Sequence, residues 1–221
     1  MTFLLPEPHL TIAMPRLDRT TAEERGLTIA DFLVPIRVGE RLNTRVRDIV
    51  LVIAGALLVW LTALVVVPHD PVPWTGQTFG VLFVGCALGF RRGFAAIGLY
   101  VLLGLVGLPV FAGGKDGITI IFGATGGYLI GFVLAGAIVG RLAELGWDRH
   151  IGGAIGAMLI GSVVIYAIGV PWLKLSTGMA WPDAVAKGLT PFVAWDLAKL
   201  LIAAGIFPTA WWLIGRRPDD R

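Results

Sequence analysis

The sequence predicts an all-α integral membrane protein, a bundle of six transmembrane helices. Of its 221 residues, 56% are hydrophobic and only 15% are charged, whereas soluble domains are about 45–50% apolar and about 25% charged. The mean hydropathy of +0.81 agrees with a chain that lies mostly in lipid. The apolar residues also gather in runs of about 20, the length at which a helix crosses the hydrocarbon core of a bilayer.

Residues 1–44 differ from the rest of the chain because they carry many charged residues and several prolines. No long apolar core precedes a small-residue cleavage site, so we do not expect a secretory signal peptide here. We expect a cytoplasmic N-terminal extension that is partly disordered. Within it, Thr28–Val38 could form a short interfacial helix with Phe32, Leu33 and Ile36 facing lipid. The alternative for the first two dozen residues is a solvated tail.

Residues 45–215 form the predicted membrane domain, and residues 216–221 form a short cytoplasmic tail. Six apolar runs divide the domain: Ile49–Val67, Trp74–Phe90, Phe94–Phe111, Ile118–Gly140, Ile151–Leu173 and Pro191–Ile214. The second and third runs are separated by a predicted turn at Arg91-Arg92-Gly93. Glycines spaced four apart in the fourth and fifth runs favour close helix packing, with a substrate lining as a further possibility.

The basic residues between the runs predict the topology of a multi-pass protein of the cytoplasmic membrane. Eleven lysines and arginines fall on one side: Arg37, Arg41, Arg45, Arg47, Arg91, Arg92, Arg141, Arg149, Arg216, Arg217 and Arg221. Only Lys115, Lys174 and Lys187 fall on the other. Because basic loops stay in the cytoplasm, we expect both termini to be cytoplasmic and the loops near 68–78, 112–117 and 174–190 to face outward.

The composition argues against several classes of function. Cys86 is the single cysteine, so the chain can form neither an internal disulfide nor a CxxC metal site. The three histidines show no ligand spacing, and basic residues form no patch typical of nucleic-acid binding. A Walker-type GxxxxGK[ST] motif is also missing. Transport driven by ATP would therefore need a partner that hydrolyses it.

Asp196 and Lys199 are the most informative residues, because both lie inside the sixth apolar run. An ionisable side chain at mid-membrane costs about 2.5–3.5 kcal/mol on insertion scales, so such residues face a cavity or each other. Residues three apart share a helix face. Asp196 follows Pro191 by about 7.5 Å of helix, which places the pair in the outer half of the membrane. The pair is either a structural ion pair or a site for a small polar solute.

Further candidate ligand contacts lie in the outer loops and at the outer helix ends. The segment Pro73–Thr78 offers the hydroxyl and amide groups of Thr75, Gln77 and Thr78, which could cap the second helix or contact the ligand. The segment Gly123–Tyr128 permits close backbone approach. An aromatic pocket around a small ligand is common, although each aromatic residue could instead belong to an interfacial belt. The aromatic candidates are Trp74, Phe79, Phe111, Tyr128, Trp172, Trp181 and Trp195.

Four segments together resemble a known family. In order they are PVPWTGQTFGVL (71–82), GLPVFAGG (107–114), GATGGYLIGF (123–132) and PFVAWDLAKL (191–200). Their order and spacing resemble BioY, the biotin transporter family, which provides the substrate-binding S components of energy-coupling factor (ECF) transporters. The resemblance covers roughly residues 45–215 and leaves out residues 1–44.

The resemblance implies high-affinity biotin uptake by a six-helix bundle with a pocket near the outer face and no cofactor. Asp196 would accept the ureido N–H groups, and Lys199 would contact either the ureido oxygen or the valerate carboxylate. The loop with Trp74, Thr75 and Gln77 resembles the segment that closes over the ligand. The expected partners are an ATPase pair and a transmembrane coupling protein, unless the chain acts alone. The implied substrate-binding residues are Asp196, Lys199, Trp74, Thr75, Gln77, Phe111 and Tyr128.

Three features of the sequence depart from the family pattern. Ala124 stands where a proline is common, and Ala112-Gly113-Gly114 lacks an asparagine that often helps to hold the ligand. The run Ile49–Val67 also lacks the alanine-x3-alanine spacing of the surface that docks the coupling protein.

Two other classes of function are compatible with a buried Asp196. One is an intramembrane enzyme with Asp196 as acid or base, but no histidine, glutamate or second aspartate lies at membrane depth to assist it. The other is a structural partner of membrane proteins in which Asp196 and Lys199 lock helices together.

Overall fold

The computed structural model describes residues 27–33 and 41–215. Most of these residues are helical, and a two-residue antiparallel hairpin pairs Val66 with Thr75 and Val67 with Trp74. The elements in chain order are α1 (Ile29–Leu33), α2 (Arg41–Ala63), β1 (Val66–Val67), β2 (Trp74–Thr75), α3 (Gln77–Leu105), α4 (Ile118–Phe122), α5 (Gly126–Glu144), the 3₁₀ helix η2 (Trp147–Arg149), α6 (Ile151–Thr177), α7 (Trp181–Gly188) and α8 (Thr190–Gly215).

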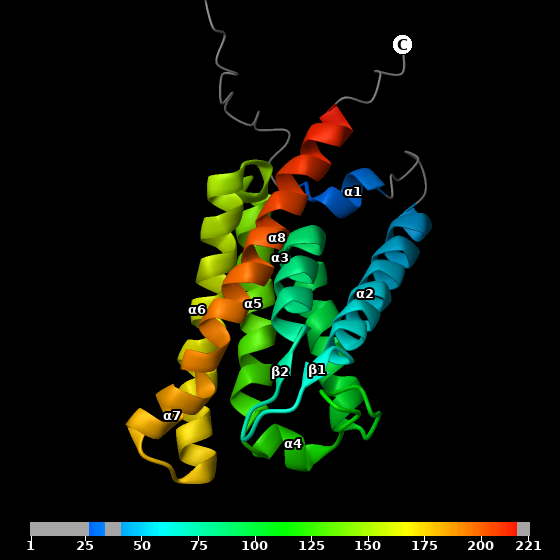
Figure 1. Ribbon diagram of the computed structural model, residues 1–221. Helices are drawn as coiled ribbons and strands as arrows, with labels where there is room; N and C mark the ends of the chain where they lie inside the picture. Colours follow the sequence, from blue (N-terminus) through cyan, green and yellow to red (C-terminus); the bar gives the residue numbers. More distant parts are fainter. Residues whose placement is uncertain (1–26, 34–40, 216–221) are drawn as a thin grey trace, which may run out of the picture.

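The long helices form a bundle with two distinct ends. Figure 1 shows α1 at one end, beside the start of α2 and the last turns of α8. The strands β1 and β2, α4 and α7 lie at the opposite end. We call these the α1 end and the hairpin end. The basic residues that were predicted to share one side, such as Arg47, Arg92 and Arg141, lie toward the α1 end.

Five stretches of the described chain are long and apolar enough to cross a membrane: Thr44–Ala63, Gln77–Leu105, Gly126–Glu144, Ile151–Thr177 and Trp181–Leu213. The prediction of an all-α membrane bundle is confirmed. The exact count of six spans is not confirmed, because the helical parts of the second and third predicted runs both belong to α3.

Helix α3 is folded into a hairpin at Gly89. Gly89 has φ 81° and ψ −177°, a conformation that is open essentially to glycine alone. A Cβ on Gly93 would lie 3.1 Å from the Cα of Gly85, so the chain reverses between these two residues. The predicted turn at Arg91-Arg92-Gly93 is therefore misplaced, since all three residues are helical. The arm from Gln77 to Leu88 is about 18 Å long, well short of a bilayer core of about 30 Å.

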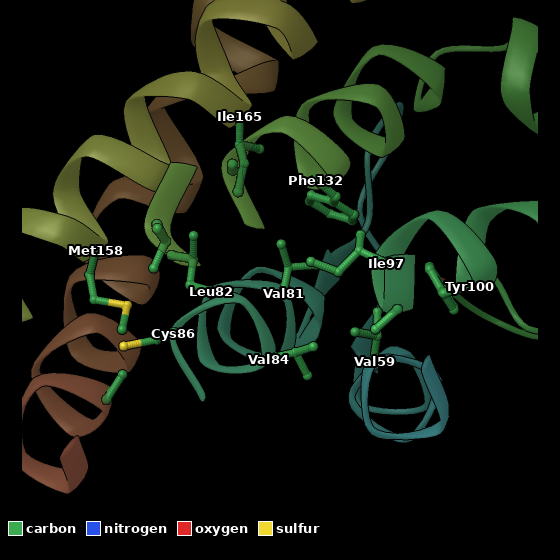
Figure 2. Close-up of a cluster of buried hydrophobic side chains, with 14 of the residues drawn as sticks. Val59, Val81, Leu82, Val84, Cys86, Ile97, Tyr100, Phe132, Met158 and Ile165 are labelled. Atoms are coloured by element: carbon green, nitrogen blue, oxygen red, sulfur yellow. The ribbon is translucent and has the colours of Figure 1, made fainter. Parts of the chain in front are cut away.

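Helix α5 lies at the centre of the bundle and uses its glycines on two faces. A Cβ on Gly131 would lie 3.0 Å from the Cα of Ile165 in α6. On the other face, Gly140 lies directly against the backbone of Gly89 and Phe90 in α3. The prediction of close approach therefore holds for the glycines of the fourth run. In the fifth run, a Cβ on Gly152 would have no atom of the described residues within 4 Å, and one on Gly156 would meet the ring of Trp147. Figure 2 shows the adjoining core, where Val81 and Ile97 from the two arms of α3 point toward Phe132 of α5.

Helix α1 is docked onto the bundle through one of its faces. Ile29 and Ala30 are buried in the main hydrophobic core. The carboxylate of Asp31 accepts hydrogen bonds from Arg92 at 2.8 and 2.9 Å and from Arg47 at 3.2 Å. A short helix was predicted here, but its buried face packs on protein rather than on lipid. The predicted lipid contacts of Phe32, Leu33 and Ile36 lie outside the described side chains.

Candidate solute-binding site

A cavity of about 190 Å³ lies toward the hairpin end of the bundle. Its wall comes from the hairpin segment, the loop after α3, the break between α4 and α5, and the helices α5, α6 and α8. Five of the predicted substrate-binding residues line it: Thr75, Gln77, Phe111, Tyr128 and Lys199. The wall is mostly apolar and aromatic with a few polar groups, which is the composition typical of small-molecule sites.

The ammonium of Lys199 is fully engaged by the protein. Its Nζ donates to the backbone oxygen of Thr75 at 2.6 Å, to Oγ1 of Thr78 at 3.0 Å and to Oδ1 of Asp196 at 2.9 Å. An ammonium group carries three donors, so no proton of Lys199 is left over. The predicted ion pair is present, and it ties α8 to the start of α3.

Asp196 lies behind the cavity wall. Its Oδ1 also accepts a hydrogen bond from Thr78 at 3.0 Å, and its Oδ2 accepts one from the hydroxyl of Tyr166. Asp196 borders an apolar groove between α6 and α8 instead of the main cavity. The carboxylate of Asp196 is therefore separated from the cavity by the three side chains that donate to it, which are Thr78, Tyr166 and Lys199.

A second chain of hydrogen bonds fixes the hairpin segment. Thr75 Oγ1 donates to Oε1 of Gln77 at 3.0 Å, and Gln77 Nε2 donates to the hydroxyl of Tyr100 at 2.5 Å. Tyr100 in turn donates to the backbone oxygen of Val110 at 3.1 Å. The amide of Gln77 is thus oriented by α3 and by the loop that carries Phe111.

Trp74 does not line the cavity. Its ring stacks on His69 with a centroid separation of 5.5 Å and meets the edge of Phe192 at 6.3 Å. Phe192 itself lines the cavity, so Trp74 forms the layer behind it. The indole Nε1 of Trp74 is buried and has no hydrogen-bond partner among the described residues.

The aromatic side chains of Phe111 and Tyr128 are held by close packing. Phe111 covers Gly104, where a Cβ would collide with the ring. Tyr128 lies against Gly169, and its hydroxyl donates to the backbone oxygen of Gly188 at 2.8 Å. Both rings are therefore preorganised walls of the cavity.

The glycine-rich segment that was predicted inside a fourth helix is a break between two helices. Helix α4 ends at Phe122 and α5 begins at Gly126. The residues between them line the cavity, and the indole N–H of Trp172 donates to the backbone oxygen of Gly123 at 2.9 Å. Hydropathy alone could not locate this break, because the run stays apolar throughout.

Tyr166 and Lys115 line the cavity and were not predicted, and Thr78, the last residue of the predicted segment Pro73–Thr78, lines it as well. Tyr166 is a tyrosine in the middle of an otherwise apolar run. It is a polar group at membrane depth and could have been singled out for that reason. Among the described residues no group of histidine, cysteine, aspartate and glutamate could hold a metal ion.

Fold and site together define a helical membrane protein with a small, mostly apolar and aromatic cavity toward one end. The family model described as the BioY family matches residues 36–216. The chain belongs to the BioY family.

Individual relatives agree with this assignment. The chain is 34% identical over 165 residues to the biotin transporter BioY2 of Lactococcus lactis subsp. cremoris (strain MG1363), covering 72% of this chain and 87% of the relative. It is 40% identical over 154 residues to the biotin transporter BioY of Thermotoga maritima, covering 70% and 85%. A crystal structure of the S-component for biotin from an ECF-type ABC transporter has the same fold, with a TM-score of 0.70 at 24% identity, over 81% of this chain and 96% of that one.

Proposed function

We propose that this protein binds biotin with high affinity from outside the cell and delivers it inward as a transporter subunit. The names of its relatives support biotin as the ligand. The observation that carries the proposal is the cavity itself, in which aromatic walls surround a polar patch of Gln77, Thr78 and Lys199, with Asp196 paired to Lys199 behind the wall. Binding by shape and hydrogen bonds needs no covalent step and no cofactor. Membership of a transporter family also separates this protein from the intramembrane-enzyme alternative.

The polar patch suits the ureido ring of biotin, which carries two N–H donors and one carbonyl acceptor. Gln77 and Thr78 offer acceptor and donor atoms at the wall, and Lys199 adds a positive charge. Direct contact between Asp196 and the ureido N–H groups would require Thr78 or Tyr166 to give up its present hydrogen bond. The predicted contact of Asp196 therefore implies a rearrangement of these two hydroxyls on binding.

Ligand entry would also require movement of the hairpin segment. The cavity of about 190 Å³ is smaller than ligand clefts of about 300–1,000 Å³. Thr75 and Gln77 of this segment form part of the cavity wall, and Lys199 is bonded to the backbone oxygen of Thr75. We expect this segment to open for the ligand and to close over it.

We further propose that both termini are cytoplasmic and that the hairpin end faces outward. The clustering of arginines toward the α1 end supports this orientation. Membrane lipid, an ATPase pair and a coupling protein remain the expected partners. Helix α2 offers the most open surface to these partners, because only 22% of the most apolar stretch of Thr44–Ala63 is buried in the bundle.

The test is isothermal calorimetry of biotin with the purified protein in detergent. We expect stoichiometric binding by the wild type, and weakening by tenfold or more, about 1.4 kcal/mol, in Asp196→Asn and in Lys199→Ala. Asp183→Asn is the matched control, since Asp183 is exposed in α7 and lines no described cavity. A folded, monodisperse wild type that binds no biotin would overturn the proposal.

A further inference from the structure

Two lysines line the cavity, and they differ in their partners. Lys199 donates its three hydrogen bonds to Thr75, Thr78 and Asp196. Lys115 is exposed, and its side chain makes no hydrogen bond or ion pair with any residue in 27–33 or 41–215. Even Asp116, the next residue in the chain, forms no ion pair with it. In the described part of the chain, Lys115 is thus the one cation at the cavity that is not already neutralised.

The backbone of Lys115 is held in place although its side chain is unbound. The N–H of Phe111 donates to the oxygen of Lys115 at 3.0 Å, and the N–H of Gly114 donates back to the oxygen of Phe111 at 3.0 Å. This tight turn is fastened to α3 twice, by the ring of Phe111 on Gly104 and by a hydrogen bond of 2.7 Å from Gly117 to the oxygen of Gly104. The backbone of Lys115 is therefore fixed at the cavity wall, while its ammonium has no partner among the described residues.

We propose that Lys115 binds the carboxylate of the ligand and so selects the acidic vitamin over neutral derivatives of it. This inference rests on the proposed function. An ammonium on a flexible four-carbon stem can follow a carboxylate at the end of a flexible chain, and charge-assisted hydrogen bonds are stronger than neutral ones. Lys199 then stays paired with Asp196 in the polar patch, and the carboxylate of the ligand falls to Lys115.

The test compares biotin with biotinamide, in which a neutral carboxamide replaces the carboxylate. Dissociation constants are measured for the wild type, Lys115→Gln, Lys115→Arg and Lys187→Gln. Lys187 is the charge-matched control, an exposed lysine of α7 at the same end of the bundle that lines no described cavity. We expect Lys115→Gln to weaken biotin about three- to tenfold, about 0.7–1.4 kcal/mol, and biotinamide by less than about twofold. Lys115→Arg should restore most of the difference.

The outcomes separate this inference from the proposed function. A wild type that binds biotin and biotinamide equally well would overturn the role of Lys115 and leave biotin binding intact. Equal weakening of both ligands by Lys115→Gln, or an equal effect of Lys187→Gln, would overturn it as well. A wild type that binds neither ligand would overturn the proposed function along with it.

Discussion

The carboxylate of Asp196 is a buried charge whose two oxygens are both satisfied. Lys199 and Thr78 donate to Oδ1, and Tyr166 donates to Oδ2. Burying a charge is tolerable only when it is paired and its remaining lone pairs are occupied. Because the donors come from α3, α6 and α8, this single carboxylate also connects three helices at membrane depth.

Removal of the Tyr166 hydroxyl should therefore destabilise the protein more than removal of a comparable neutral hydrogen bond. We expect Tyr166→Phe to lower the free energy of unfolding by about 1.5–3 kcal/mol, because the lost bond is to a charged group. Tyr128→Phe is the control, since its hydroxyl donates to the neutral oxygen of Gly188, and we expect it to cost about 0.5–1.5 kcal/mol. Equilibrium unfolding in mixed detergent micelles measures both, and equal losses would contradict the charge argument.

Among the elements, α3 does most to shape the site. Its reversal at Gly89 lets both arms pack on α5, and each arm supplies part of the site. The first arm begins at Gln77 and Thr78, while the second brings Tyr100 and Gly104 to support the loop that bears Phe111 and Lys115. A straight helix of the same length would carry these two groups to opposite ends of the bundle.

An alanine at Gly89 should be poorly tolerated. The positive φ of 81° strains any other residue, and a Cβ there would lie 2.7 Å from Oε1 of Glu144 and 2.9 Å from Cγ2 of Thr28. We expect Gly89→Ala to lower the free energy of unfolding by about 1–3 kcal/mol. Gly98→Ala, in the second arm of α3 with no neighbouring atom within 4 Å, should be neutral or stabilising by up to about 1 kcal/mol. Thermal unfolding in detergent would contradict this account if the two substitutions behaved alike.

For the molecule as a whole, two carboxylates at the α1 end respond to pH in opposite directions. Burial raises the pKa of Asp31, but hydrogen bonds from Arg92 and Thr28 outweigh it and hold that pKa below the ordinary 3.8. Burial raises the pKa of Asp148 to about 6, despite the hydrogen bond from Trp211 and the charge of Arg149. Asp31 therefore stabilises the fold above pH 3.8 and ceases to do so only as the pH falls below that value.

The raised pKa of Asp148 predicts that stability falls as the pH rises from about 4 to about 6. In that window the folded protein keeps a proton on Asp148 that the unfolded chain has already lost, so raising the pH favours unfolding. Asp148→Asn keeps an acceptor for Trp211 Nε1, which lies 2.7 Å from Oδ2, and removes the titration. The difference in unfolding midpoint between variant and wild type should grow across this window. A constant difference from pH 4 to pH 7 would show that Asp148 has an ordinary pKa.

Local sequence patterns were enough to predict the membrane class, most of the spans and the pairing of Asp196 with Lys199. Hydropathy adds up along a local stretch of chain, and residues three apart on a helix meet whatever the rest of the fold does. Five predicted site residues also lie together, because the loops that carry them share the hairpin end of the bundle. Their role in binding stays a prediction.

Packing between helices, in contrast, sets where α3 reverses and which side chains face the cavity. Arg91 and Arg92 interrupt the apolar pattern just after Gly89 and so predicted a turn nearby. The exact point of reversal depends on the conformation of Gly89 together with the close approach of Gly140. Likewise, Asp196 lies behind Thr78 and Tyr166. The ammonium of Lys115 has no partner among the described residues, whereas that of Lys199 is paired with Asp196. These relations join residues more than 30 positions apart or on different elements, so they follow from packing between helices and not from any local pattern.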